Sequence, residues 1–224
     1  MNNIELLNYM PSSILDLPAD KCIELYHDIF SSYITREGSS ELASFVEKSD
    51  FFTAPASTRF HMCVPNGLLK HSLIVMLCLL HKKKNPVWGE ILKQYSEETL
   101  IIVSIFHDLC KTYFYKSSTK NVKVYKENGT KHDAGGNYDW ETQPCYEVND
   151  KYPLGHGEKS CYFLTKFIDL NIAEYSSIRW HMGYTLSKDD YSTLGNAMDT
   201  YPLVLALHEA DLEATHLIEV NYQK

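Results

Sequence analysis

The segment LIIVSIFHDLCKTYF, residues 100–114, constrains the fold of this 224-residue chain more than any other. On a helix, its polar residues fall at i, i+3, i+4 and i+7: Ser104, His107, Asp108 and Lys111. A solvated helix face would carry more charge than this narrow stripe, so the stripe must be satisfied inside the protein. A metal ion is one way to satisfy it. The His-Asp dipeptide alone favours a metal only weakly, because short motifs have many false matches.

The rest of the sequence predicts a mostly helical chain with one core. Hydrophobic residues make up 44% of the sequence, and no shift in composition requires a second domain. We therefore expect one compact unit, with an N-terminal helical extension over residues 1–50 and the main domain over 51–224. Apolar residues at helical spacing predict helices over 20–33, 40–47, 67–80, 88–95, 97–113, 157–168, 172–182 and 201–220.

The helical pattern is interrupted between residues 116 and 153. Residues typical of β-strands occupy 121–126 and 144–148, and a stretch rich in Gly, Asn and Asp separates them over 127–140. This pattern predicts a β-hairpin with a flexible tip, inserted between helices as a flap near the functional site. The hairpin carries four aromatic side chains: Tyr125, Tyr138, Trp140 and Tyr146. We expect them either to stack on a nucleobase or to pack the hairpin onto the helices.

Charge and cysteine usage restrict the classes of partner and location. The formal net charge is −8, which argues against binding to duplex DNA, since such binding depends on clustered Lys and Arg. A local basic pocket could still hold a small anionic substrate. The six cysteines contain no CxxC pair, and neither a secretion signal nor a membrane-spanning run is present. We therefore expect a cytoplasmic protein that does not insert into a membrane.

Four further residues have the chemistry of metal ligands. His71 lies among leucines on the helix predicted over 67–80, where by itself a hydrogen-bonded core histidine is the better interpretation. Asp211 lies on the apolar face of the last helix, and a buried carboxylate needs a partner. His156 and His181 lie at predicted helix edges. Imidazole and carboxylate ligands together suit divalent transition metals.

The ordered set of these residues resembles the HD-domain metal-dependent phosphohydrolase superfamily over roughly residues 51–220. The order is His71, His107-Asp108, His156, His181 and Asp211. The resemblance is closest to phosphodiesterases and 3′ to 5′ exoribonuclease-like members, whose Gly-Leu-Leu-x-His opening is similar to residues 67–71 here. It implies an all-α HD-domain helical bundle, to which the β-hairpin of residues 116–153 would be a small insertion.

The resemblance also implies a role for each residue. His71, His107, Asp108 and Asp211 would bind a first metal ion, and Asp108 would bridge to a second ion held by His156 and His181. One or two divalent ions are expected, chosen from Mn, Fe, Zn, Ni, Co and Mg. Lys111 would hold a phosphate oxygen or orient the nucleophile, although it could equally be a surface lysine at a helix end. Other residues expected to bind substrate are Arg59, His61, Lys159 and Arg179, the last of which could instead form a structural ion pair.

These inferences predict hydrolysis of a phosphomonoester or phosphodiester by metal-activated water, with Asp108 and Lys111 as the catalytic residues. The expected substrate is a small phosphate ester, a nucleotide or a short single-stranded oligonucleotide. Two alternatives stay open: a di-iron oxygenase of the same superfamily, and a catalytically silent module that binds a nucleotide. The sequence does not specify the oligomeric state.

Overall fold

A long apolar helix forms the centre of the fold. It is α4 (Gly67–Lys82), and nearly all its side chains are buried. In the computed structural model, which describes residues 6–59, 61–127, 129–131, 137–185 and 187–221, α6 (Glu97–Phe106) and α10 (Leu203–Glu213) pack against α4. Among the described residues, no helix is both long and apolar enough to cross a bilayer. The cytoplasmic location stays a prediction.

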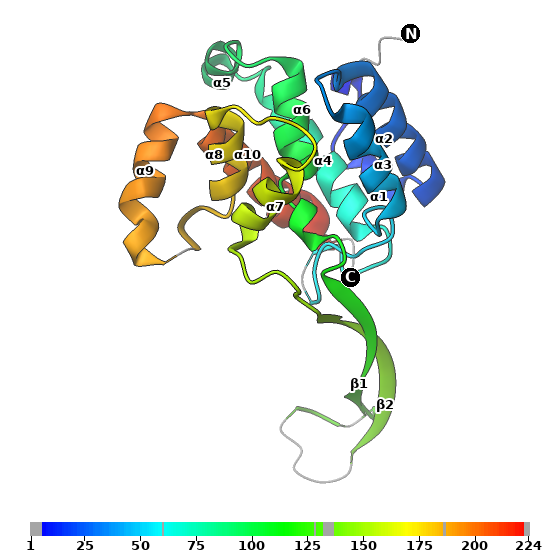
Figure 1. Cartoon of the computed structure of the whole chain (residues 1–224). Helices are drawn as coiled ribbons and strands as arrows, with labels where there is room; N and C mark the ends of the chain where they lie inside the picture. The colour runs from blue at the N-terminus through cyan, green and yellow to red at the C-terminus, as the bar shows by residue number, and fades with distance from the viewer. Residues whose placement is uncertain (1–5, 60, 128, 132–136, 186, 222–224) are drawn as a thin grey trace.

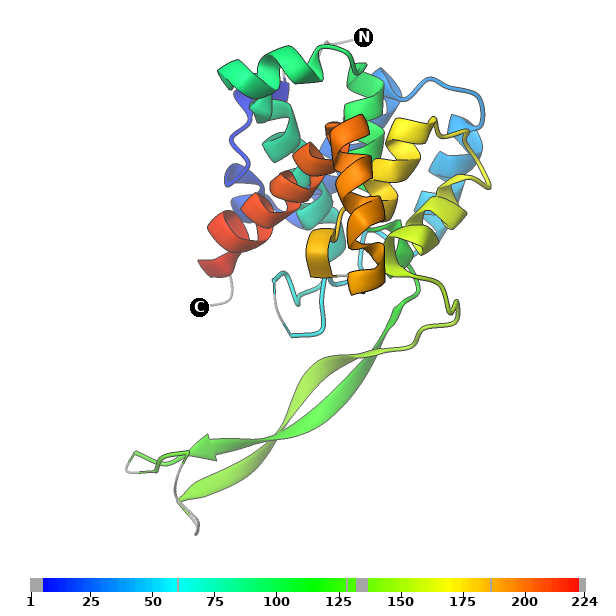
Figure 2. The ribbon, with the colours of Figure 1, turned by 90° about the vertical axis from the view of Figure 1, so that its left-hand side faces the viewer.

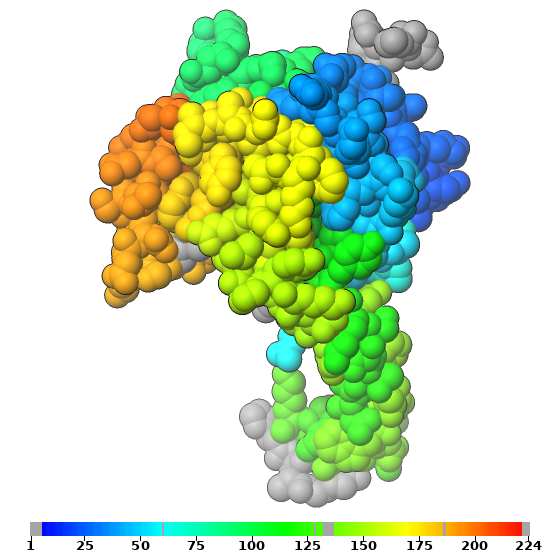
Figure 3. All heavy atoms as spheres, in the orientation of Figure 1, coloured from blue at the N-terminus to red at the C-terminus, as the bar shows by residue number. Residues whose placement is uncertain are grey.

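The other helices surround this centre. Figure 1 shows the N-terminal helices on one side of α4 and α6, with α7 and α8 on the other and α9 outermost. In the space-filling view of Figure 3, α7 and α8, in yellow, meet the N-terminal helices, in blue, on the face towards the viewer. These helices are α1 (Ser13–Asp16), α2 (Ala19–Tyr33), α3 (Ser39–Lys48), α5 (Pro86–Leu92), α7 (His156–Leu164), α8 (Ile172–Trp180) and α9 (Tyr191–Thr200).

The main hydrophobic cluster runs from Leu6 near the N-terminus to Ala214 after α10, and a smaller cluster of Trp180, Leu194 and Val204 lies beside α9. The first helices therefore share the core with the rest of the chain. The buried ammonium of Lys70 on α4 donates to the carbonyl oxygen of Leu15 at 2.8 Å, which ties α4 to the end of α1. The mostly helical class expected from the sequence is confirmed. The division into residues 1–50 and 51–224 stays a prediction.

The helix expected over residues 97–113 ends earlier than its apolar pattern predicts. α6 stops at Phe106, and the chain continues in tight turns to Tyr113, whose φ of +57° lies in the left-handed region. His107 therefore lies at the C-terminal end of α6, and Lys111 lies on a separate 3₁₀ turn (Leu109–Lys111). The last helix also ends early, because α10 passes into a π-helical turn (Ala214–Ile218) and a 3₁₀ turn (Glu219–Asn221).

The expected hairpin is present and is longer than its β-type residues predict. β1 (Tyr115–Tyr125) and β2 (Tyr138–Val148) pair antiparallel, with Tyr115 opposite Val148 and Tyr125 opposite Tyr138. Figure 2 shows this two-stranded sheet extending away from the helical body. The predicted tip, residues 127–140, includes the first three residues of β2, and positions 128 and 132–136 of that tip lie outside the described residues.

Candidate metal centre

Three side chains from the central helices converge on Asp108, which follows the end of α6. His71 comes from α4, His107 from the end of α6 and Asp211 from α10. The Nε2 atom of His71 lies 3.3 Å from Nε2 of His107 and 3.3 Å from Oδ1 of Asp211. Oδ2 of Asp108 lies 3.6 Å from His71 Nε2 and 3.4 Å from His107 Nε2. We call these three residues, with Oδ2 of Asp108, the inner half of the cluster.

The other carboxylate oxygen of Asp108 faces a second pair of histidines. Its Oδ1 atom lies 2.6 Å from Nε2 of His156, the first residue of α7, and 3.6 Å from Nε2 of His181, at the end of α8. We call His156 and His181, with Oδ1 of Asp108, the outer half. The structure therefore brings together all six residues that the sequence singled out as ligands. Each oxygen of Asp108 faces a different pair of histidines.

Helix ends orient two of these histidines. His107 and His181 directly follow the last residues of α6 and α8, where backbone carbonyls lack helical partners. Nδ1 of His107 lies 2.7 Å from the carbonyl oxygen of Ser104, and Nδ1 of His181 lies 2.7 Å from that of Ile178. A carbonyl oxygen only accepts, so both Nδ1 atoms donate. In a neutral ring this leaves the Nε2 lone pair directed at the cluster.

Two glycines allow the elements around the outer half to approach closely. A Cβ atom on Gly157 would lie 2.5 Å from the carbonyl oxygen of Ile178, so glycine lets the start of α7 meet the end of α8. Gly183 has φ +58°, and a Cβ there would lie 2.3 Å from the His208 ring. His208 in turn donates from Nδ1 to the carbonyl oxygen of His181 at 2.7 Å. His208 therefore supports a ligand candidate, His181, through the backbone.

The charges of the cluster depend on one another. Burial raises the pKa of Asp108, but the adjacent Lys111 and the histidines outweigh burial and hold this pKa well below its usual value. Burial lowers the pKa of His71, yet the carboxylates of Glu219 and Asp211 raise it to about 10. In the metal-free protein a proton on His71 therefore supplies positive charge between the carboxylates. A metal ion bound at the same place would take over that role.

The spacing of the inner half fits ligands that share one ion. Ligand atoms at about 2.1 Å from a metal are about 3.0 Å apart in an octahedron and about 3.4 Å apart in a tetrahedron. Nε2 of His71 lies 3.3 to 3.6 Å from its three neighbours in the inner half, and Nε2 of His107 lies 3.4 Å from Asp108; these separations are close to those values and longer than most hydrogen bonds. Ligand atoms of His71, His107 and Asp108 all lie within 4.8 Å of one another, and so do those of His107, Asp211 and the adjacent His181 of the outer half. The donor set of imidazoles and carboxylates therefore suits a divalent transition metal.

A cavity of about 370 Å³ opens onto the cluster. Its polar lining includes four of the six ligand candidates, together with Lys111 and His61. Tyr115 and Val148, from the base of the hairpin, line its wall as well, so the expectation that the hairpin base lies near the cluster is confirmed. Nζ of Lys111 lies 2.5 Å from Oδ2 of Asp108. Burial lowers the pKa of this ammonium, but the Asp108 carboxylate outweighs burial and raises the pKa above its usual value. Lys111 is therefore a buried cation at the cavity, not a surface lysine.

The other predicted substrate-binding residues occupy different environments. His61 lines the cavity, and burial lowers its pKa to about 4. Arg59 is exposed, Lys159 pairs with Asp150 at 2.5 Å, and Arg179 pairs with Glu158 at 2.6 Å while its guanidinium lies over the Trp180 ring. In the described part of the chain, none of Arg59, Lys159 and Arg179 lines this cavity. Arg179 forms the structural ion pair that was the alternative for it.

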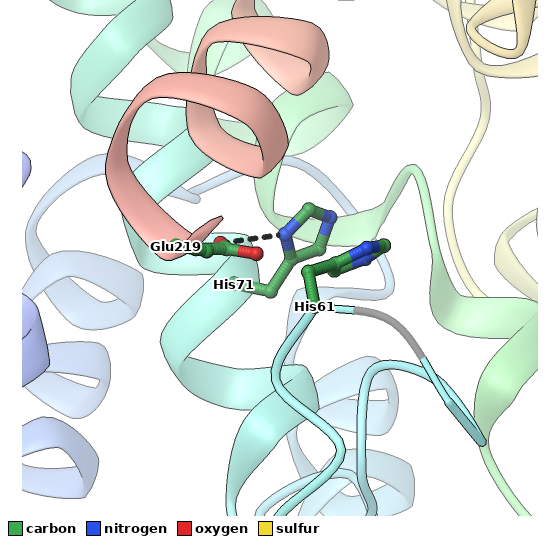
Figure 4. Close-up of side chains that lie close together, drawn as sticks. All are labelled: His61, His71 and Glu219. Carbon is green, nitrogen blue, oxygen red and sulfur yellow. Dashed lines mark hydrogen bonds and ion pairs between the residues drawn. The ribbon is translucent and has the colours of Figure 1, made fainter. Parts of the chain in front are cut away.

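Sequence reasoning missed two residues that contact the ligand candidates. Glu219 accepts a hydrogen bond from Nδ1 of His71 at 2.9 Å (Figure 4). The sulfur of Cys110 lies 3.3 Å from Nδ1 of His156. The one general signal for such partners is chemical, because a histidine that binds a metal through one nitrogen needs a partner for the other. That rule predicts a partner but not its position in the sequence.

Comparisons of this chain with protein-family models, with curated protein sequences and with solved structures found no match. The site consists of four histidines and two aspartates, and four of these six residues line one cavity.

Proposed function

We propose that this protein is a metal-dependent phosphohydrolase of the HD-domain type that acts on a small phosphate ester such as a nucleotide. The observation that carries the proposal is the position of Asp108, whose two oxygens face two separate pairs of histidines. This arrangement suits a carboxylate that bridges two divalent ions. Manganese, iron, zinc, nickel, cobalt and magnesium are the candidates.

The residues of the chain have separate tasks in this proposal. His71, His107 and Asp211 hold one ion with Asp108, and His156 and His181 hold the other. A bound divalent ion polarises phosphoryl oxygens and lowers the pKa of a water molecule that attacks phosphorus. Lys111 keeps the Asp108 carboxylate ionised and offers its ammonium to a phosphate oxygen at the cavity wall.

The cavity supports a small substrate. Its volume of about 370 Å³ is at the lower end of the range for small-molecule sites, roughly 300 to 1,000 Å³. Its wall combines apolar side chains, such as Met182 and Leu212, with His61, whose low pKa keeps the ring neutral near pH 7. A neutral imidazole can donate a hydrogen bond to a substrate oxygen. The positive charge that attracts the phosphate then comes from Lys111.

The test begins with the metal content of the purified protein, measured by mass spectrometry after loading with each candidate ion. Each loaded form is then incubated with bis(p-nitrophenyl) phosphate, p-nitrophenyl phosphate and a panel of nucleotides, with and without oxygen. We expect one or two ions per chain and release of phosphate or nucleotide in both atmospheres. His107→Gln should lower turnover by roughly 10²-fold, whereas His27→Gln, which changes a half-exposed histidine paired with Glu47, should not.

Three outcomes would contradict the proposal. Oxygen consumption by an iron-loaded form, without phosphate release, would favour the oxygenase alternative. Nucleotide binding by the metal-loaded protein, without turnover of any substrate, would favour a silent binding module. A wild-type protein that binds no divalent ion would remove the metal assignment itself.

A further inference from the structure

Glu219 is a buried acid outside the set of six ligand candidates. The exposed fraction of its side chain is 0%, and acidic side chains are almost never fully buried unless they are paired. Its Oε1 atom lies 2.9 Å from Nδ1 of His71, whereas its Oε2 atom has no hydrogen-bond partner among the described residues. His71 is therefore the partner that compensates for the burial of Glu219. Figure 4 shows the two side chains pointing towards each other from α4 and the C-terminal turn.

The position of His71 explains why it needs such a partner. His107 and His181 lie at helix ends, where free carbonyls three residues earlier accept from their Nδ1 atoms. His71 is instead the fifth residue of the 16-residue helix α4, where the helix itself uses the neighbouring carbonyls. A partner for its Nδ1 atom has to come from another part of the chain. Glu219, 148 residues away in sequence, supplies it.

The backbone after α10 departs from α-helical geometry just before this contact. Asp211 on α10 lies 3.3 Å from Nε2 of His71, and Glu219 lies 2.9 Å from Nδ1 of the same ring. Between them the chain forms the π-helical turn Ala214–Ile218. Such turns are rare and often occur at functional sites. Here the segment from α10 to Glu219 contacts one imidazole at both nitrogens.

The surroundings of the pair keep water away from it. The ring of His61 lies against the ring of His71, with 4.8 Å between centroids and 38° between planes. The exposed fraction of the His71 side chain is 1%. In such a low-dielectric position a charge-assisted hydrogen bond is stronger than at the surface. The contact therefore fixes the orientation of the ring.

We propose that Glu219 is a positioning residue for His71: it accepts the Nδ1 hydrogen, so that Nε2 is directed at Asp108, His107 and Asp211 as a metal ligand. This inference rests on the proposed metal site. Glu219 does not itself line the cavity, and the side-chain hydrogen bond that it makes among the described residues is to His71. Carboxylate partners of this kind change metal affinity by roughly 10- to 100-fold when they are removed from metal-binding histidines.

The test compares Glu219→Ala and Glu219→Gln with the wild-type protein. Glu213→Gln is the matched control, because Glu213 is a carboxylate of the same C-terminal segment that contacts Lys82 instead of His71. Manganese affinity is measured by titration calorimetry, and the ring hydrogens of His71 are followed by ¹⁵N-edited NMR of the metal-free protein. We expect Glu219→Ala to weaken manganese binding 10- to 100-fold. It should also remove the protected signal of the hydrogen on Nδ1.

Glu219→Gln keeps an oxygen that accepts from Nδ1 and has nearly the same shape, so it should fold and restore part of the affinity. Glu213→Gln should bind manganese as the wild type does. If Glu219→Ala keeps both the wild-type affinity and the Nδ1 hydrogen signal, the inference is overturned. If Glu219→Ala does not fold, a Gln variant with wild-type affinity and an unprotected Nδ1 hydrogen overturns it instead.

The NMR measurement also separates this inference from the proposed function. It uses the metal-free protein, so it reports on the Glu219 contact even if no divalent ion binds. A wild-type protein that binds no metal but shows the protected Nδ1 hydrogen would contradict the proposed function. It would still support the inference that Glu219 orients the His71 ring.

Discussion

The inner and outer halves of the cluster differ in how their histidines are held. In the inner half, His71 and His107 are fully buried, and their Nδ1 atoms are bound by a carboxylate and a backbone carbonyl. In the outer half, the side chain of His156 is 29% exposed, and its Nδ1 atom faces the thiol of Cys110. Both inner histidines lie behind the lining of the cavity, whereas both outer histidines line it.

The hydrogen bonds of His156 show what this difference means. Burial raises the pKa of Cys110 to about 12, so its thiol keeps its proton at neutral pH. Nε2 of His156 lies 2.6 Å from Asp108, a distance at which it donates a hydrogen bond in the metal-free protein. To bind a metal, His156 must release this hydrogen and become protonated on Nδ1. An ion in the inner half therefore needs only the loss of the extra proton on His71, whereas in the outer half the ring hydrogen of His156 must also move from Nε2 to Nδ1.

The largest effect is expected at Asp108, because both halves depend on it. Asp108→Ala should remove both ions and lower turnover by roughly 10³-fold, the upper range for loss of one principal charge-stabilising group. Metal analysis and the phosphatase assay check this result. Asp150→Ala is a suitable control, since Asp150 pairs with Lys159 outside the cavity lining. An Asp108→Ala protein that still holds two ions would show that the two halves are not joined through this residue.

A change confined to the outer half should have a smaller effect. His156→Ala or His181→Ala should reduce the metal content by about one ion per chain and lower the rate by roughly 10²-fold, with the fold retained. The remaining ion should bind with wild-type affinity, because the inner half is intact. Calorimetric titration of each variant distinguishes one site from two. Loss of both ions in either variant would contradict the division into halves.

The pH dependence of the metal-free protein should report on the inner half. The pKa of His71 is raised to about 10 by its carboxylates, whereas an unfolded histidine titrates near 6.5. Its contribution to stability is therefore complete below about pH 6.5 and is lost as the pH rises towards 10. Metal binding must displace the same proton, so the affinity of the inner half should rise by up to about tenfold per pH unit in this window.

Two measurements between pH 6.5 and 10 test these opposite trends. Thermal unfolding of the metal-free protein follows the loss of stability, and titration with manganese follows the gain in metal affinity. His71→Gln removes the titrating group and should flatten both. A melting temperature of the wild type that stays constant across this range would show that His71 is not held protonated by Glu219 and Asp211.

The order and chemistry of the ligand candidates could be read from the sequence, but their second partners could not. His71 and Asp211 stood out because polar side chains on apolar helix faces need compensation. The contact between His71 and Glu219 depends on the π-helical turn after α10, which no residue pattern marks. No spacing in the sequence marks Cys110 as a partner, and the turn after Phe106 brings its thiol to His156.

Helix and strand lengths show the same limit. The apolar spacing of residues 97–113 continues past Phe106, so periodicity alone extended α6 too far. The first half of β1 is rich in Ser, Thr and Lys, and it forms a strand because each residue pairs with one of β2. The helix α9 was not predicted at all. The pairing of β1 with β2 and the packing of Leu194 of α9 beside Trp180 and Val204 are contacts between distant residues, which local sequence preference does not reveal.

The smallest effect is expected from the far end of the hairpin. Tyr125, Tyr138 and Trp140 contact one another there, and the ammonium of Lys123 lies 4.0 Å from the centre of the Tyr138 ring. Only Tyr115 and Val148, at the base, line the cavity among the described residues of the two strands. Joining Val122 to its partner Glu141 through an Asn-Gly turn removes this aromatic end and keeps the base.

The shortened protein should bind its metals as before and hydrolyse a mononucleotide with a KM within about twofold of the parent, because a ligand in the cavity cannot reach the removed rings. For a single-stranded oligonucleotide, which is long enough to touch both, KM should rise roughly fivefold, the loss expected for one weakly stacked base at about 1 kcal/mol. Trp140→Ala should reproduce most of this change, since Trp140 is the most exposed of the three rings, at 61%. If the shortened protein treats both substrates as the parent does, the hairpin has no part in recognition, and selectivity then lies in the cavity beside the outer half.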